Sequence, residues 1–79
     1  MTIFKHNSII PDPGKECLFI TNKDECFFGF VHFEDETVFE GQKIDAHYYI
    51  NDSFGEFQYI YGIDNNIDRW AYVKDILML

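Results

Sequence analysis

Apolar segments of strand length alternate with short polar clusters in the first part of the chain. Residues 17–21 and 26–33 are rich in Phe, Ile, Val and Cys, and they flank a polar break at 22–25. Aromatic and β-branched residues favour a pleated strand, so the two segments predict a β-hairpin. Residues 11–14 (Pro-Asp-Pro-Gly) predict a tight turn before it, because proline can continue neither a helix nor a central strand.

The segment at 26–33 is apolar on both faces of the strand that it predicts. Alternate positions place Phe28 and Phe30 on one face and Val31 on the other. A strand that is apolar on both faces is covered on both faces. The cover must come from a curled, barrel-like sheet, from another segment of the chain or from a partner subunit. Gly29 favours a bend or a bulge in mid-strand, and therefore curling.

A second hairpin is predicted in the middle of the chain. Residues 46–50 and 56–61 are rich in aromatic residues, and they flank a loop that ends in Gly55. Glycine at this place suits a left-handed residue that returns the chain. Residues 37–40 predict a further short strand, which the polar residues 41–43 close.

The tail of the chain, residues 67–79, fits two interpretations. Ile67, Trp70 and Ala71 follow helical spacing, whereas residues 70–73 also fit a last strand. We favour a strand followed by a short helical or extended end. The whole pattern predicts a mainly β fold: a single domain, residues 1–79, with a small antiparallel, curled or barrel-like sheet of about five strands.

Charge narrows the classes of function. Fourteen acidic residues face six basic ones, for a formal charge of −8, yet 47% of the chain is hydrophobic. Disorder requires low hydrophobicity as well as high net charge, so we expect a folded chain. An acidic surface repels nucleic acid and anionic membranes and attracts basic partners. No apolar run approaches the ~20 residues of a membrane span, and no secretory signal is visible, so we expect a cytoplasmic protein.

The cysteines and histidines form no recognisable reactive motif. On the predicted hairpin Cys17 and Cys26 lie about 13 Å apart, whereas a disulfide spans about 7 Å between Cα atoms, so we expect two reduced, buried thiols. His6, His32 and His47 lack the spacing of a metal site. The acidic composition also disfavours a thiolate nucleophile. We therefore expect no enzyme, no metal and no cofactor.

Two landmarks carry a resemblance to a known family. Ile10-Pro11-Asp12-Pro13-Gly14 leads into an apolar strand, and Arg69-Trp70 lies near the end of the chain. With these landmarks the chain resembles a family of small, uncharacterised phage and prophage proteins, which carry Leu-Pro-x-x-Gly before an apolar strand and His-Trp near the end. The resemblance implies a small β-rich fold and a phage or mobile-element origin.

Binding to a basic protein is the function that these features favour. Acidic residues in or beside turns would attract the partner, and aromatic residues would anchor it, because interface energy concentrates in buried aromatic side chains. Phe54 fits two interpretations equally, an exposed anchor at a hairpin tip or a side chain that folds back onto its own sheet. The predicted partner-binding residues are Asp24, Glu25, Glu34, Asp35, Glu36, Glu40, Asp52, Glu56, Tyr48, Tyr49, Phe54 and Tyr61.

The expected function is a non-enzymatic inhibitor that a phage or mobile element directs against a host defence nuclease. Such an anti-CRISPR-like or anti-restriction-like protein would place carboxylates where nucleic-acid phosphates bind, and would itself bind neither nucleic acid nor membrane. One alternative is an immunity protein that neutralises a bacterial nuclease toxin. Another is a small phage structural or assembly protein that oligomerises through its second strand, and a homodimer is also compatible with the pattern.

Overall fold

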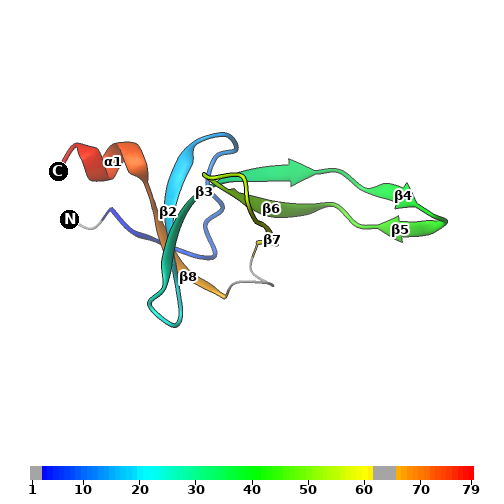
Figure 1. Cartoon of the computed structure of the whole chain (residues 1–79), viewed down its shortest axis with the longest axis horizontal. Coiled ribbons are helices and arrows are strands. Elements are labelled where there is room, and N and C mark those ends of the chain that lie inside the picture. The colour runs from blue at the N-terminus through cyan, green and yellow to red at the C-terminus, as the bar shows by residue number, and fades with distance from the viewer. Residues whose placement is uncertain (1–2, 62–65) are drawn as a thin grey trace.

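A computed structural model describes residues 3–61 and 66–79 of the chain. Eight strands and one short helix follow one another along it (Figure 1). The elements are β1 (Lys5–His6), β2 (Glu16–Thr21), β3 (Cys26–Glu34), β4 (Thr37–Phe39), β5 (Gln42–Ile44), β6 (His47–Asp52), β7 (Gln58–Ile60), β8 (Ile67–Tyr72) and α1 (Val73–Leu77). The prediction of a mainly β fold with a strand and a short helix at the end is confirmed.

Six of the strands form one antiparallel sheet in the order β1-β8-β2-β3-β6-β7. β2, β3, β6 and β7 are a meander, and β8 returns to pair with β2. The strand order leaves β1 and β7 at the two edges of the sheet, and a side-chain hydrogen bond links the chain beside one edge to the chain beside the other. Tyr61, which follows β7, donates its hydroxyl to the carbonyl of Asn7, which follows β1, at 2.9 Å.

The core lies on the concave face of this sheet. Phe19 and Trp70 are register partners, as are Val31 and Ile50, and all four side chains are fully buried.

The close approach of β3 and β6 explains why a glycine, Gly29, stands in the middle of β3. A Cβ atom at this position would lie 2.7 Å from the carbonyl oxygen of Asn51, so only glycine allows β3 and β6 to approach this closely.

The N-terminal segment is held against the core by the polar tips of aromatic side chains. Trp70 donates its indole N–H to the carbonyl of Ile9 at 2.8 Å, and the Tyr72 hydroxyl accepts a hydrogen bond from the backbone N–H of Asp12 at 2.9 Å. Between these two contacts Pro11 is buried. The predicted turn at residues 11–14 is therefore part of the core boundary rather than a free loop.

A second two-stranded sheet, β4 and β5, projects away from the body of the molecule (Figure 1). The sequence predicted one short strand here and a closing turn at 41–43, and this was wrong. Residues 42–44 form a second strand, and the turn lies at Glu40 and Gly41, whose φ values are 51° and 78°. The pairing of Thr37 with Ile44 keeps the register of Phe33 with Tyr48, so the projection continues the β3–β6 hairpin.

Two expectations about burial are corrected by the fold. The outer face of β3 is not fully covered, because the curled sheet closes over its concave face alone, and Phe28 remains 44% exposed there. Cys26 lies at the start of this strand and is an exposed thiol, whereas Cys17 is buried; both are free, as expected.

We expect Gly29→Ala to lower the free energy of unfolding by about 1–3 kcal/mol, because the added methyl group must displace the backbone of β6. Urea denaturation measures the change. Gly41→Asn is the control, since its left-handed φ suits asparagine and no atom lies within 4 Å of the added Cβ. Equal stability of Gly29→Ala and the parent protein would contradict the tight approach of the two strands.

Candidate functional site

The acidic residues among the predicted partner-binding residues lie in three separate parts of the molecule. Asp24 and Glu25 occupy the turn between β2 and β3, at the bottom of Figure 1. The acidic residues from Glu34 to Glu40 lie on the projecting hairpin at its right-hand side. Asp52, Phe54 and Glu56 belong to the connection between β6 and β7. The acidic turns therefore do not share one face.

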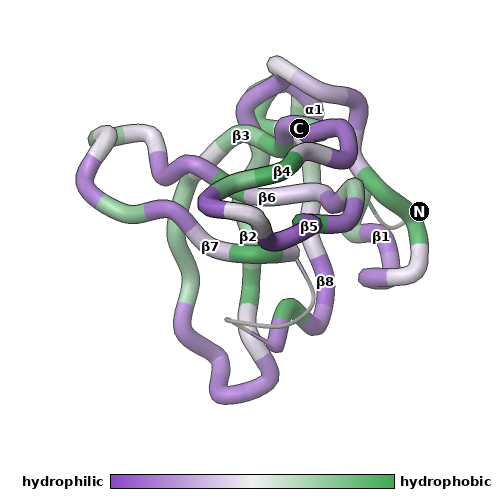
Figure 2. Tube along the Cα trace, turned by 90° about the vertical axis from the view of Figure 1, so that its right-hand side faces the viewer, coloured by the Kyte–Doolittle hydropathy of each residue, from purple (hydrophilic) through white to green (hydrophobic). Residues whose placement is uncertain are grey.

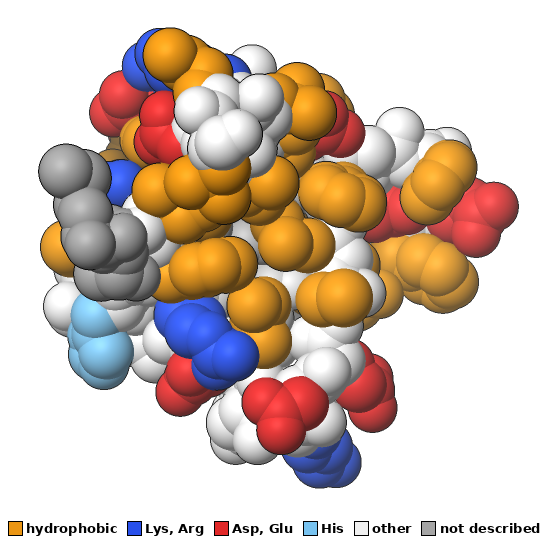
Figure 3. Space-filling model, turned by 90° about the vertical axis from the view of Figure 1, so that its left-hand side faces the viewer, with side chains coloured by type: hydrophobic (Ala, Val, Ile, Leu, Met, Phe, Trp, Pro, Cys, Tyr) orange, Lys and Arg blue, Asp and Glu red, His pale blue; other side chains and the backbone are white. Residues whose placement is uncertain are grey.

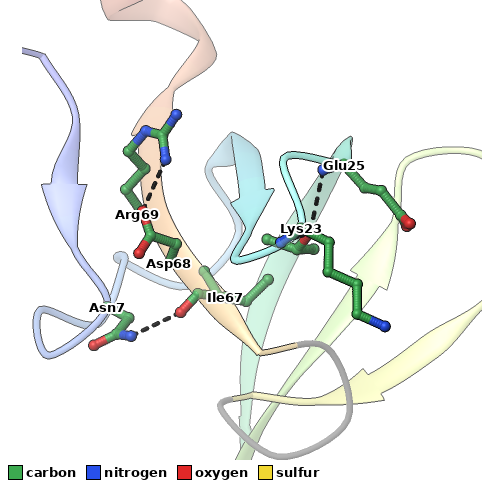
Figure 4. Close-up of polar contacts among 7 residues, drawn as sticks. Asn7, Lys23, Glu25, Ile67, Asp68 and Arg69 are labelled. Carbon is green, nitrogen blue, oxygen red and sulfur yellow. Dashed lines mark hydrogen bonds and ion pairs between the residues drawn. The ribbon is translucent and has the colours of Figure 1, made fainter.

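The turn between β2 and β3 is an ordered polar cap. The Thr21 hydroxyl accepts hydrogen bonds from the backbone N–H groups of Lys23 and Glu25, at 3.3 and 3.2 Å. With the backbone fixed in this way, the side chains of Lys23 and Glu25 extend away from the turn (Figure 4). The lysine among the carboxylates makes this turn less acidic than the projecting hairpin.

We call the projecting hairpin, residues 34–47, the arm. It carries five carboxylates and one lysine, a formal charge of −4, which is half the net charge of the chain. The lysine, Lys43, contacts Glu36 at 3.4 Å, and both side chains are more than half exposed. The other four carboxylates belong to Glu34, Asp35, Glu40 and Asp45, and all four residues are exposed. The arm is thus the most concentrated acidic element among the residues that the structure describes.

One side of the arm carries four large apolar residues, with the polar residues Asp35, Thr37 and Gln42 between them. The rings of Phe33 and Tyr48 pack 5.1 Å apart at its base. Strand alternation in the unbroken register places Ile44 and Phe39 on the same side as this pair. All four side chains are among the exposed large apolar residues, and Phe39 is 64% exposed. We call these four residues the apolar stripe. Figure 2, in which the arm points toward the viewer, shows β4 as a hydrophobic strand.

Tyr49 lies on the opposite side of the arm's base and is half-buried. Its ring packs 5.5 Å from His32 and 5.9 Å from His47. His47 in turn lies 3.0 Å, through Nδ1, from the carbonyl oxygen of Asp45. This ladder of rings fixes the base of the arm on the body.

Two of the predicted partner-binding residues have structural roles instead. Asp52 points inward, where its carboxylate accepts backbone N–H bonds from Glu56 and Phe57, both at 2.7 Å, and from Phe54 at 3.3 Å. Turn-forming aspartate commonly binds its own backbone in this way. Tyr61 is half-buried and joins the two sheet edges. Neither side chain belongs to an exposed binding surface.

Phe54 does not fold back onto the sheet, because its side chain is 83% exposed at the β6–β7 connection. Glu56 is exposed in the same loop. The neighbouring Ser53 donates its hydroxyl to Glu16 at 2.5 Å, which ties the loop to β2. This loop is a second, smaller exposed site, separate from the arm.

The apolar stripe was not predicted from the sequence. Phe33, Phe39 and Ile44 were not among the predicted binding residues, although they stand inside the most acidic run of the chain. Large apolar residues interspersed with carboxylates are a usable signal, because a solvated acidic loop needs no such residues.

The buried thiol and phenol are held in their neutral forms. Burial, with a smaller contribution from the nearby Glu16 carboxylate, raises the pKa of Cys17 from 9.0 to about 12. Burial likewise raises the pKa of Tyr61 from 10.0 to about 12. A thiol with so high a pKa is a poor nucleophile. In the parts of the chain that the structure describes, no three His, Cys, Asp or Glu side chains gather to hold a metal ion.

Comparison with protein families, with curated proteins and with solved structures found no match to this chain. Within the described residues, no helix is long and apolar enough to cross a membrane. The site must therefore be interpreted from its own residues.

We expect Asp52→Ala to lower the free energy of unfolding by about 2–3 kcal/mol, because three backbone N–H groups lose their acceptor. Asp52→Asn keeps one acceptor oxygen and should cost less. Asp45→Ala, on the exposed arm, is the control and should change stability by less than about 0.5 kcal/mol. Thermal or urea unfolding measures all three, and equal effects of Asp52→Ala and Asp45→Ala would contradict the inward role.

We also expect stability to fall in alkali. In the unfolded chain Cys17 and Tyr61 lose their protons near pH 9 and 10, whereas in the folded protein they keep them to about pH 12. The unfolded state then binds fewer protons, so the free energy of unfolding is unaffected below pH 9 and declines as the pH rises toward 12. Urea denaturation at successive pH values should show a shallower decline for Cys17→Ala than for the parent or Cys26→Ala. Parallel curves for all three would be the contradicting result.

Proposed function

We propose that this chain is a non-enzymatic binding protein whose arm blocks the nucleic-acid-binding surface of a basic protein. The observation that carries the proposal is the arm itself, a hairpin that leaves the body of the molecule with carboxylates along it and an apolar stripe on one side. A hairpin of this shape fits a groove that is basic at its walls and partly apolar at its floor.

The charge of the arm supports recognition of a basic groove. A nucleic-acid site attracts phosphates with Lys and Arg, and carboxylates at comparable positions meet the same groups. Opposite potentials raise association rates up to about 10⁸–10⁹ M⁻¹s⁻¹ at low salt. Lys43 pairs with Glu36, and the other four carboxylates of the arm are exposed, so they are available to the cations of the groove.

The apolar stripe would supply net binding affinity, which exposed charges alone contribute only weakly. Exposed ion pairs contribute little net affinity, whereas a buried aromatic anchor often dominates an interface. Phe39 at the tip and the Phe33–Tyr48 pair at the base would be buried on docking. The stripe therefore favours a specific protein groove over general attraction to any basic surface.

A phage or mobile-element inhibitor of a host defence nuclease is the biological setting that we favour. The physical requirement is the same for an immunity protein that covers a nuclease toxin, and the two settings differ in where the target is found. In both, the target is a protein that handles nucleic acid, and bound inhibitor and nucleic acid exclude each other.

The test compares charge reversal at two matched acidic pairs. Glu34→Lys/Asp35→Lys changes the arm, and Asp24→Lys/Glu25→Lys makes the same chemical change in the β2–β3 turn. A basic protein captured from nuclease-treated host lysate on the immobilised chain is purified, and its affinity for each variant is measured across a salt series. We expect the arm variant to bind at least about 100-fold more weakly and the turn variant within a few-fold of the parent.

Competition with nucleic acid completes the test. The captured protein should lose its nucleic acid as the parent chain is added, and should keep it when the arm variant is added. Circular dichroism of each variant checks that the fold is intact. Equal losses for the two reversed pairs, or a ternary complex with nucleic acid still bound, would overturn the proposal.

A further inference from the structure

The outer face of the sheet presents an apolar surface on the side of the molecule that faces away from the arm. Figure 3 views this side, which is the left-hand side of Figure 1, and hydrophobic side chains run across its centre. The register places the residues of β2, β3 and β8 on this face in rows: Leu18 pairs with both Phe28 and Ala71, and Ile20 pairs with Cys26. Phe30 continues the row of Phe28 along β3. We call Leu18, Ile20, Cys26, Phe28 and Phe30 the outer patch; Ala71 lies behind it and is fully buried.

The outer patch carries no charge, although the chain has a net charge of −8. Two ionised residues of opposite sign share this face: Glu16, the register partner of Phe30, accepts the Ser53 hydroxyl, and Arg69, the partner of Ile20, binds Asp68 at 2.8 Å (Figure 4). These groups are already engaged within the chain. Phe28, Leu18, Ile20 and Phe30 remain partly open to solvent. Apolar surface of this kind, rimmed by polar groups, is typical of a protein–protein interface.

We infer that the outer patch joins two copies of this chain into a dimer, patch to patch. The absence of charge on the outer patch favours a second copy of this chain over a basic partner. A basic partner would bury Lys and Arg side chains against an uncharged surface. Removing water from these cations costs free energy, and no carboxylate of the patch compensates for it. A second copy brings an equally neutral, apolar surface, and the same patch serves both sides of a two-fold interface.

The positions of the arms remove the main obstacle to this dimer, which is repulsion between two acidic chains. The outer patch faces away from the arm, on the side of the 48 Å long molecule where α1 also lies. In a patch-to-patch dimer the two arms therefore point away from each other. Their separation is several times the Debye length of about 8 Å at physiological ionic strength, so the repulsion between arms is screened.

Side chains alternate between the two faces of β3. Gly29 and Val31 lie on the face that packs in the core, and Phe28 and Phe30 lie on the face that would contact the second copy.

The dimer does not depend on the proposed function of the arm, and salt separates the two. Sedimentation equilibrium of the parent chain, over a concentration series that reaches about 1 mM, should show the mass rise from 9.4 kDa to twice that value. Added salt screens the repulsion between acidic chains and should strengthen the dimer, whereas it weakens the binding of a basic partner to the arm.

Phe28→Glu is the decisive variant, with Phe39→Glu at the tip of the arm as its matched control. A carboxylate buried in an apolar interface should raise the dimer dissociation constant at least about 100-fold, and the same change on the arm should leave it within about threefold. Phe28 is 44% exposed in the single chain, so folding should survive, and circular dichroism checks this.

Cys26 gives an independent readout, because it lies within the outer patch while Cys17 is buried. Its rate of alkylation should fall as the parent protein is concentrated and should stay constant in Phe28→Glu. A mass of 9.4 kDa at every concentration with constant alkylation of Cys26, or a dimer that Phe28→Glu leaves intact, would overturn the inference. Either result would leave the arm's binding to a basic partner untouched.

Discussion

The fold depends on aromatic side chains that are apolar in the core and polar at its edge. Trp70 packs in the centre of the concave face and still reaches the carbonyl of Ile9, and Tyr61 and Tyr72 reach the backbone of Asn7 and Asp12. A chain of 79 residues has few residues to spare for closing a core. These three rings bury apolar surface and also provide hydrogen-bond partners for the segment that covers them. Without them the N-terminal segment would lose the hydrogen bonds that hold it to the sheet.

The same hairpin builds both the core and the arm. Val31 and Ile50 face each other in the core, and the register that pairs them continues to Thr37 and Ile44 at the far end. A projection that shares its strands with the core is held in position by core packing, so less conformational entropy is lost when a partner binds it. The ring ladder of His32, Tyr49 and His47 adds to this support at the base.

The two ends of the molecule differ in chemistry. The arm concentrates half of the net charge around the apolar stripe, whereas the outer patch consists of uncharged, apolar residues that face away from the arm. Joined through that patch, two chains would present two arms that point in opposite directions, each able to engage a basic partner. Binding through two arms can exceed the affinity of one where the target is itself repeated. The dimer and the inhibitor are therefore compatible proposals that rest on different residues.

Much of the local structure follows from the sequence alone. The hairpin of β2 and β3, the turn at residues 11–14 and the strand at the tail are set by proline, by glycine and by aromatic and β-branched residues, which act over a few neighbours. The sequence also predicted that Cys17 stays a protonated thiol, because apolar surroundings and nearby carboxylates both oppose a thiolate. The acidic residues of the arm were found as well, since charge is visible without a fold.

Only the tertiary structure decided which face of each strand is core and which is surface. The sequence of β3 is apolar on both faces, and the pairing with β2 and β6 selects Val31 for the core and leaves Phe28 outside. β1 is two residues long and exists because β8, more than sixty residues away, pairs with it. Asp52 turned inward because the backbone of its own loop offered N–H donors. The buried face of β3 and the existence of β1 depend on contacts between residues distant in sequence, and the orientation of Asp52 depends on the path of its loop. The helix and strand preferences of single residues predict neither.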